Sequence, residues 1–215
     1  LLRHPSFQFA SEGDDRVPHV EELVAGGDGG EHMQAAGYVT FGTGKWHNGP
    51  PSYARSFDSG GEIFFGGMDD HWNVPAYHYD PSGRYDQACP YTPDPFQSNA
   101  LKYRRCDHVS PGKHSTDLFA DSALRFLTDH DTSRPFFLYV PHSMVHVPLH
   151  VSDKFAGKSK RGLFGDVVME VDWSVGEILG AIRRHGLEKD TMVIFTADNG
   201  PWLSYGTHAG SARPL

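Results

Sequence analysis

Three short apolar runs stand out in the pattern of hydrophobic and polar positions, and each leads directly into polar residues. They cover residues 38–41, 136–140 and 192–196, and they are rich in β-branched and aromatic side chains. Such runs are typical of strands that are buried on both faces of a sheet. The pattern therefore predicts three strands of a parallel or mixed sheet.

Two longer segments carry apolar residues at helical spacing. Residues 115–130 begin with Ser115 or Thr116 as N-cap candidates, and Asp117 lies near the positive end of the helix dipole. Residues 166–185 end just before Gly186, which suits a C-terminal cap. The second helix is predicted to bury a stripe made of Val168, Val171, Val175, Ile178, Leu179 and Ile182.

Helix followed by strand, twice, predicts an α/β fold with a mostly parallel or mixed sheet and helices on both faces. Such folds bind ligands beyond the carboxyl ends of their strands. Residues 48–113 are rich in Gly, Pro, Tyr and His and show little periodicity. We expect them to form an insertion over the active site rather than a separate domain, so that residues 1–215 belong to one domain.

Composition narrows the function classes. The chain has 215 residues, with 19 Lys and Arg against 27 Asp and Glu and a formal net charge of -8. This sign argues against nucleic acid as a partner. No apolar run approaches the roughly 18 residues of a membrane span, and no signal-peptide pattern opens the sequence to reveal a compartment.

The two cysteines do not indicate a metal site. Cys89 and Cys106 lack C-x-x-C spacing, which argues against zinc. A single disulfide and two free thiols are both compatible with the sequence.

The segment 37–47 ends in Gly-Lys-Trp-His. Lys45 and His47, two residues apart at the end of a buried strand, suit an anionic ligand. The ammonium neutralises anionic oxygens, and the imidazole can move protons. An ordinary surface lysine after a strand is the alternative for the short motif alone.

The second strand is followed by His142 and His146. His146 lies in a His-x-Pro motif, where an imidazole can bind an anion and donate a proton to a leaving oxygen. A single loop histidine is more commonly solvated, and His142 is the weaker candidate of the two.

The third strand leads into Asp198 and Asn199. A carboxylate and an amide carbonyl are hard oxygen donors suited to Ca²⁺ or Mg²⁺. Asp-Asn-Gly is by itself a common turn sequence. Its position after an apolar strand favours metal binding.

The order of these motifs resembles the sulfatase family of the alkaline phosphatase superfamily over about two thirds of the chain. The resemblance implies an alkaline phosphatase-like sheet and hydrolysis of a sulfate ester on a small molecule or carbohydrate. It assigns catalytic roles to Lys45, His47 and His146 and metal-binding roles to Asp198 and Asn199. It also implies a divalent metal, Ca²⁺ or Mg²⁺, a formylglycine nucleophile made from Cys or Ser, and a periplasmic, lysosomal or secreted parent.

The resemblance is incomplete. No C/S-x-P-S-R sequence, the site of formylglycine formation, occurs in the chain. The Asp-Asp pairs at 14–15 and 69–70 do not follow apolar strands, and we interpret both as solvated loop carboxylates. The simplest interpretation is an interior fragment, truncated at both ends and inactive alone.

Two other functions stay open. One is a phosphate-ester or phosphodiester hydrolase of the same superfamily, although its two-metal members tend to carry Asp-His where this chain has Asp198 and Asn199. The other is a non-catalytic anion-binding derivative. The sequence does not identify the ester. Four aromatic residues can stack on a sugar or an aryl group, or can equally pack within the insertion: His71, Trp72, Tyr77 and Tyr85.

Overall fold

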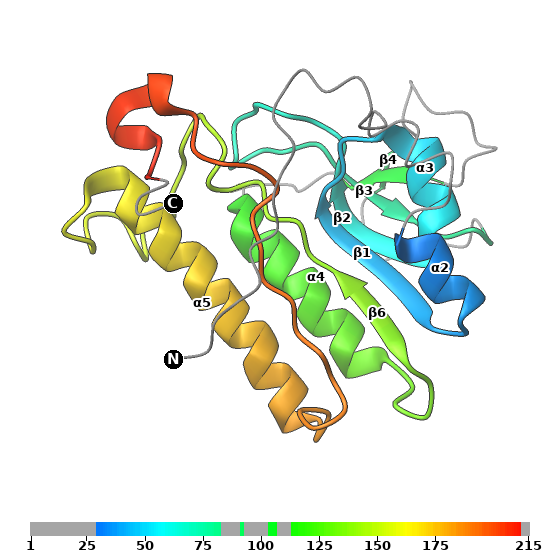
Figure 1. The fold of residues 1–215 in the computed structure, drawn as a ribbon. Coiled ribbons are helices and arrows are strands. Elements are labelled where there is room, and N and C mark those ends of the chain that lie inside the picture. Colours follow the sequence, from blue (N-terminus) through cyan, green and yellow to red (C-terminus); the bar gives the residue numbers. More distant parts are fainter. Residues whose placement is uncertain (1–28, 83–90, 93–102, 107–112, 212–215) are drawn as a thin grey trace, which may run out of the picture.

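The computed structural model describes residues 29–82, 91–92, 103–106 and 113–211. Its centre is a mixed sheet of six strands in the order β4-β5-β3-β2-β1-β6. Helices cover both faces of this sheet (Figure 1). The α/β fold with a mixed sheet and helices on both faces is therefore confirmed.

The parallel part of the sheet consists of β1 (Val39–Lys45), β2 (Ser59–Phe64) and β6 (Phe136–Tyr139). β1 lies in the middle, with Phe41 opposite Ser59 on one side and Leu138 on the other. Two of the three predicted strands thus form, and they lie next to each other. Their carboxyl ends meet at one edge of the sheet.

The rest of the sheet is antiparallel and comes from the segment expected to be an insertion. β3 (Ala76–Tyr79) pairs with β2, β5 (Tyr103–Cys106) with β3, and β4 (Tyr91–Thr92) with β5. Much of the described part of residues 48–113 is therefore regular structure. It extends the sheet because β2 pairs with β1 on one side and with β3 on the other. That the remainder lies over the active site stays a prediction.

The alternation of side chains along β1 separates the two helical layers. Gly42 faces α3 (Gly49–Ser56), where the Tyr53 hydroxyl donates a 2.8 Å hydrogen bond to the Gly42 carbonyl. Phe41 faces the opposite side and stacks on Phe126 of α4 (Ser115–Asp129) at 4.6 Å between ring centres. The short α2 (Gly29–Ala35) joins α3 through a 3.0 Å ion pair between Glu31 and Arg55.

The long helix α5 (Gly162–Arg184) packs beside α4 in the same layer. Leu127 of α4 meets Ala181 and Ile182 of α5 in a buried cluster. Both helices form close to where the sequence predicts them. The chain continues from α5 along the helical layer to a 3₁₀ turn, η2 (Leu203–His208), which lies beside the start of α5 (Figure 1).

The third predicted strand does not form. Residues 192–196 carry no regular secondary structure, and the side chains of Ile194 and Phe195 are 79% and 73% exposed. Within the described residues β6 pairs only with β1, so its other edge is open, but residues 192–196 do not pair with it. The composition of this apolar run is typical of a buried strand. A strand also needs hydrogen bonds to a neighbouring strand, and the apolar pattern does not predict that pairing.

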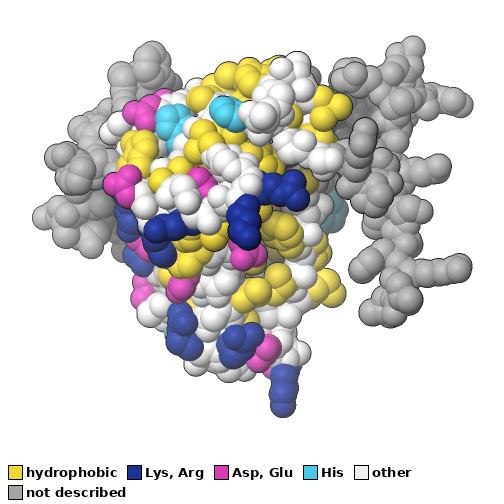
Figure 2. Space-filling view, turned by 90° about the vertical axis from the view of Figure 1, so that its left-hand side faces the viewer, with side chains coloured by type: hydrophobic (Ala, Val, Ile, Leu, Met, Phe, Trp, Pro, Cys, Tyr) yellow, Lys and Arg dark blue, Asp and Glu magenta, His cyan; other side chains and the backbone are white. Residues whose placement is uncertain are grey.

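The buried face of α5 agrees with the prediction only in part: Ile182 is buried, and two further residues of the predicted stripe pack against buried clusters. Val168 and Leu179 of the predicted stripe are 43% and 36% exposed, whereas Val167, Glu170 and Ser174 are buried. Figure 2 shows the face on the α5 side, where hydrophobic side chains lie among Lys and Arg side chains. This helix is apolar on more than one side, so the pattern alone does not select the side that meets α4.

No helix in the described ranges is long and apolar enough to cross a membrane. Asp14, Asp15, Tyr85 and Cys89 lie outside the described residues, so the alternatives for the cysteines are unchanged.

Candidate active site at the carboxyl edge of the sheet

Lys45 is the last residue of β1, and the backbone around it is fixed from two sides. Its amide donates a 2.7 Å hydrogen bond to the carbonyl of Pro141, which follows β6. The next amide, of Trp46, donates to the carbonyl of Phe64 at the end of β2 at 2.8 Å. Lys45 is thus placed where three parallel strands end.

Gly44 makes this arrangement possible. Its φ of +111° lies in the region that favours glycine, and a Cβ at this position would collide with the Pro141 carbonyl oxygen. A side chain at residue 44 would therefore push apart the end of β1 and the chain that follows β6. The glycine of the Gly-Lys-Trp-His motif accordingly has a local steric reason.

Trp46 anchors the turn that follows. Its indole N–H donates to the Ser52 hydroxyl at 2.9 Å and to the Gly49 carbonyl at 3.1 Å, and its ring is buried. His47, by contrast, is exposed and stands beside Gly67 in the loop after β2. The motif thus combines a buried anchor with two side chains available to a ligand.

His146 lies in a loop that packs against α5. Met144, Val147 and Leu149 of this loop form a buried cluster with Val167. Nδ1 of His146 lies 2.6 Å from the carbonyl oxygen of Val147, which fixes this nitrogen as the donor in that contact. Nε2 is therefore the nitrogen that can meet a ligand.

His142 has a packing environment instead. Its Nε2 lies 3.4 Å from the hydroxyl of Ser174 on α5. Burial lowers the pKa of His142 to about 4, so its imidazole is neutral near neutral pH.

A buried polar cluster joins the loops around this edge. Nδ1 of His114 lies 3.1 Å from a carboxylate oxygen of Glu170, and both side chains are fully buried. Nδ1 of His71 lies 3.0 Å from the Ser115 hydroxyl. Burial, together with the charges of neighbouring histidines, lowers the pKa of His71 to about 4.

Two of the four aromatic residues proposed for stacking on a substrate belong to this cluster. His71 is fully buried, and the Trp72 ring packs on His114 at 5.4 Å. Tyr77 packs on Phe65 at 5.4 Å between ring centres. These contacts show that His71, Trp72 and Tyr77 all take part in packing.

Asp198 and Asn199 lie in an exposed turn. The Asn199 amide donates to the Asp198 carboxylate at 2.9 Å, and the Asn199 side chain donates to the Gly200 carbonyl at 2.8 Å. All their hydrogen bonds are within this turn. The structure thus connects Lys45 with the loop of His146, but it does not join Asp198 or Asn199 to them.

The described side chains do not complete a metal site. Among them, no group of three or more His, Cys, Asp or Glu residues is placed to hold a metal ion. Asp198 and Asn199 provide two residues, whereas Ca²⁺ takes about 6–8 oxygen ligands. These two residues alone do not fit the ion, and the metal stays a prediction.

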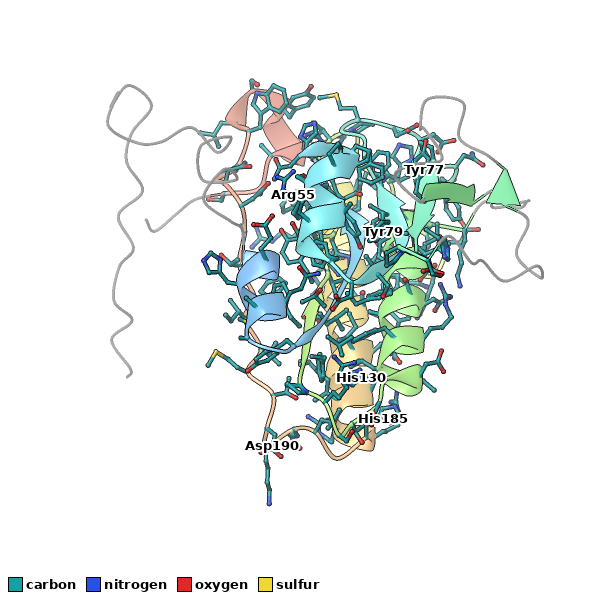
Figure 3. The ribbon with its side chains drawn as sticks, turned by 90° about the vertical axis from the view of Figure 1, so that its right-hand side faces the viewer. Arg55, Tyr77, Tyr79, His130, His185 and Asp190 are labelled. Carbon is teal, nitrogen blue, oxygen red and sulfur yellow. The ribbon has the colours of Figure 1, made fainter. Side chains whose placement is uncertain are left out.

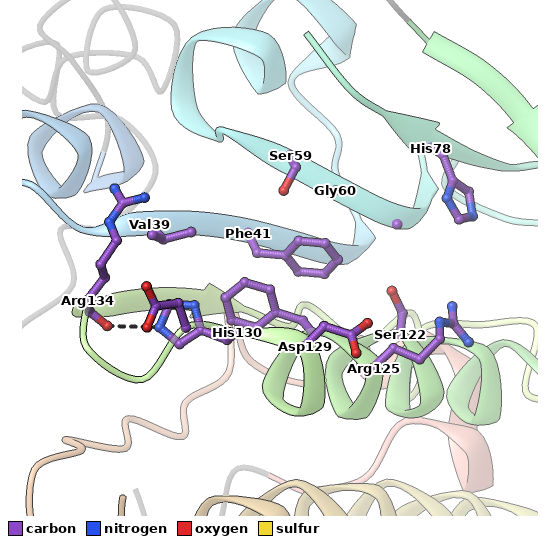
Figure 4. Close-up of a pocket in the computed structure, with 13 residues that line it drawn as sticks. Val39, Phe41, Ser59, Gly60, His78, Ser122, Arg125, Asp129, His130 and Arg134 are labelled. Carbon is purple, nitrogen blue, oxygen red and sulfur yellow. Dashed lines mark hydrogen bonds between the residues drawn. The ribbon is translucent and has the colours of Figure 1, made fainter. Parts of the chain in front are cut away.

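A groove of about 460 Å³ lies elsewhere, between α4 and the middle of the sheet. Figure 4 shows Phe41 in its wall, with Arg125 and His78 farther along. Arg125 and His78 both approach the buried carboxylate of Glu62, at 3.2 and 3.4 Å. None of the five predicted site residues lines this groove, so it is separate from the candidate site.

The carboxyl edge of the sheet carries Lys45 and His47 at the end of β1, and His146 lies in the loop that follows β6. A cation and two imidazoles suit an anionic ligand, and the carboxyl edge of the sheet is where α/β folds bind their ligands.

Comparison with known proteins identifies the family. The sequence profile of the sulfatase family matches residues 30–214, and the chain belongs to this family. N-acetylgalactosamine-6-sulfatase of Mus musculus is 31% identical over 208 residues, which cover 92% of this chain and 36% of the mouse protein. Human arylsulfatase G is 34% identical over 203 residues, covering 86% and 38% of the two chains.

A solved structure supports the fold. Ps i-CgsB, in complex with k-i-k-neocarrahexaose, superposes with a TM-score of 0.61 at 23% identity, covering 86% of this chain and 42% of the other. The fold is the alkaline phosphatase-like fold of the sulfatases, in incomplete form. The chain spans only a little over a third of the length of the curated relatives quoted above.

Sequence reasoning missed the contact between Glu170 and His114. Glu170 lies three residues after Val167 and four before Ser174, and all three are buried on one side of α5. A polar residue in line with apolar helix positions is a signal for a buried pair, but its partner, 56 positions earlier in the sequence, leaves no local trace.

Proposed function

We propose that this chain is the part of a sulfate-ester hydrolase that holds the sulfate group and protonates the leaving oxygen. The observation that carries the proposal is the 2.7 Å hydrogen bond from Lys45 to Pro141. It ties the end of β1 to the start of the His146 loop in a chain of the sulfatase family. Sulfate-ester hydrolysis is the chemistry of the family.

The three side chains take separate roles. The Lys45 ammonium neutralises the sulfate oxygens. In its protonated form, His146 keeps Nδ1–H on the Val147 carbonyl and directs Nε2–H toward the ester oxygen that departs. His47, exposed beside Gly67, contributes a further hydrogen bond to the bound anion.

We further propose that the complete protein supplies what these 215 residues lack. A formylglycine, formed in a C/S-x-P-S-R sequence, would be the nucleophile, and further carboxylates would join Asp198 and Asn199 around Ca²⁺ or Mg²⁺. Such an ion would supply Lewis-acid polarisation of the sulfate group. No part of the roles given to Lys45 and His146 depends on these groups.

The substrate proposed is a sulfated carbohydrate. Two observations support this class: the mouse relative is named as an N-acetylgalactosamine-6-sulfatase, and Ps i-CgsB was solved with a neocarrahexaose. A protein acting on such substrates would work in the periplasm, in a lysosome or outside the cell.

Turnover of an aryl sulfate tests the proposal. We expect multiple turnovers from the complete protein and none from residues 1–215, because the covalent step needs the nucleophile. In the complete protein, Lys45→Ala should lower kcat/KM by about 100-fold or more, whereas Lys189→Ala, at an exposed lysine beyond the end of α5, should not.

The other outcomes distinguish the alternatives. Turnover of an aryl phosphate in preference to the sulfate would favour a phosphate-ester hydrolase. Binding of sulfate without turnover by the complete protein would favour the non-catalytic derivative. Multiple turnovers by residues 1–215, abolished by Lys45→Ala, would overturn the assignment of the nucleophile to another part of the protein.

A further inference from the structure

The loop that carries His146 is held at both ends by hydrogen bonds to other elements. At its start, the Pro141 carbonyl accepts from the Lys45 amide at 2.7 Å. At its end, the Ser152 amide donates to the second carboxylate oxygen of Glu170 at 3.0 Å. Glu170 thus holds the far end of the loop by a hydrogen bond, as the end of β1 holds the near end.

The other carboxylate oxygen of Glu170 also has a close contact that fixes the side chain. That oxygen lies 3.1 Å from Nδ1 of His114, the residue that precedes α4 and whose carbonyl accepts the first hydrogen bond of that helix. Burial acts to raise the pKa of Glu170, but the adjacent His114 side chain and the hydrogen bond from Ser152 outweigh it, so the pKa is lowered and the carboxylate is charged at neutral pH.

The cluster reaches the loop from a second side. The Ser115 amide donates to the His71 carbonyl at 2.9 Å, and the His71 ring lies 5.4 Å from the ring of His150. The loop after β2, the start of α4, the His146 loop and α5 therefore meet in one buried polar group. Apolar packing of Met144 and Leu149 holds the loop against α5, and these polar contacts fix its position along the helix.

A buried charged pair is weak evidence for a contribution to stability, because removing both charges from water offsets most of their attraction. Its directional contacts do constrain geometry. A displacement of about 1 Å at a group that binds a reacting anion is enough to reduce its effectiveness about 100-fold.

We propose that Glu170, backed by His114, is a positioning residue that sets where His146 stands relative to Lys45. This inference rests on the proposed function for its catalytic meaning. The geometric part, that Glu170 controls the environment of His146, holds independently of any ligand.

The test compares Glu170→Gln with Asp172→Asn in residues 1–215. Both substitutions remove one negative charge from α5, but Asp172 is exposed. Nitrogen–proton spectra of the histidine rings report on each imidazole without a ligand. We expect Glu170→Gln to shift the His146 signals, while His130 and His185, labelled at the far end of the helical layer in Figure 3, keep theirs.

Titration with sodium sulfate adds the functional measurement. We expect Glu170→Gln to weaken sulfate binding about tenfold, Lys45→Ala to abolish it, and Asp172→Asn to leave it unchanged. If the unsubstituted chain of residues 1–215 binds no sulfate, the proposed function fails for this chain. The ring spectra still decide whether Glu170 positions His146.

Unchanged His146 signals and unchanged sulfate affinity in a folded Glu170→Gln variant would overturn the inference, as would an equal effect of Asp172→Asn. Thermal unfolding and near-ultraviolet circular dichroism establish that each variant is folded. If Glu170→Gln does not fold, Glu170→Asp keeps the buried charge but withdraws it from Ser152, and the same two outcomes decide the question.

Discussion

The two halves of the predicted site differ sharply in how they are supported. Around Lys45 and His146, the backbone is braced by hydrogen bonds to β2, to the chain after β6 and to Glu170. Around Asp198 and Asn199, the chain is exposed, and within the described residues the hydrogen bonds of these two side chains stay inside their own turn. Both halves follow apolar runs of similar composition. In this structure, the strand pattern fixes the position of a functional residue where the segment pairs within the sheet, and it does not where the segment stays unpaired.

The largest expected effect comes from adding one methyl group to each half. Gly44→Ala forces a side chain onto a positive φ and into the Pro141 carbonyl, so it should lower the free energy of unfolding by about 3–4 kcal/mol. Gly200→Ala meets nothing within 4 Å and should change it by less than about 0.5 kcal/mol. Urea unfolding of both variants measures the difference, and equal losses would contradict it.

Apolar truncation sharpens the same contrast. Ile182 is 6% exposed beside Leu127, and Ile182→Ala should cost about 2–3 kcal/mol through lost burial and a residual cavity. Ile194→Ala, at a side chain 79% exposed, should cost less than about 0.5 kcal/mol. A large loss at Ile194 in thermal unfolding would mean that the 192–196 segment is packed after all.

Acidification should weaken the braced half. The pKa of His71 and that of His142 are lowered from 6.5 to about 4 in the folded chain. Between these pH values the unfolded chain binds more protons, so stability falls as the pH drops from about 6.5 to about 4 and then levels off for these two groups.

The variant His71→Gln should lose about half of this slope, because its share of the proton uptake is removed. His185→Gln, at an exposed histidine, is the matched control. Denaturant titrations at several pH values measure the slope, and a full slope in His71→Gln would show that His71 is not held neutral by burial.

The smallest effect is expected for Ca²⁺ binding at Asp198 and Asn199, in the exposed half of the site. With two ligand residues, residues 1–215 should bind Ca²⁺ only with a Kd in the range of about 1 mM or weaker. Asp198→Asn should then change the calorimetric signal little. Tight one-to-one binding would show that the ligand set includes residues other than those identified.

Much of the braced half is predictable from the sequence. The segment from Gly37 to His47 combines a strand, a glycine and two chemically useful side chains within eleven residues. The helix at 115–130 is also apparent, because its apolar residues, N-cap candidates and length agree. These features are local, and local features survive in a short window of sequence.

The remainder depends on partners far away in the chain. Ile194 is exposed because its segment does not pair with the open edge of β6, and Glu170 is buried against His114. Neither relation leaves a periodic signal. β2 was missed because Gly60 and Gly61 weaken its strand pattern, although both glycines are needed where Tyr53 and Ser122 approach the backbone closely.

The exposed segment at 192–196 also governs how the polypeptide behaves at high concentration. Met192, Val193, Ile194 and Phe195 form an uncharged run with strong β propensity and no proline, and all four side chains are at least half exposed. Runs of this kind pair with identical runs from other molecules, and a single charge interrupts them. Self-association of residues 1–215 should therefore rise with concentration, and Ile194→Lys should keep more of the protein soluble.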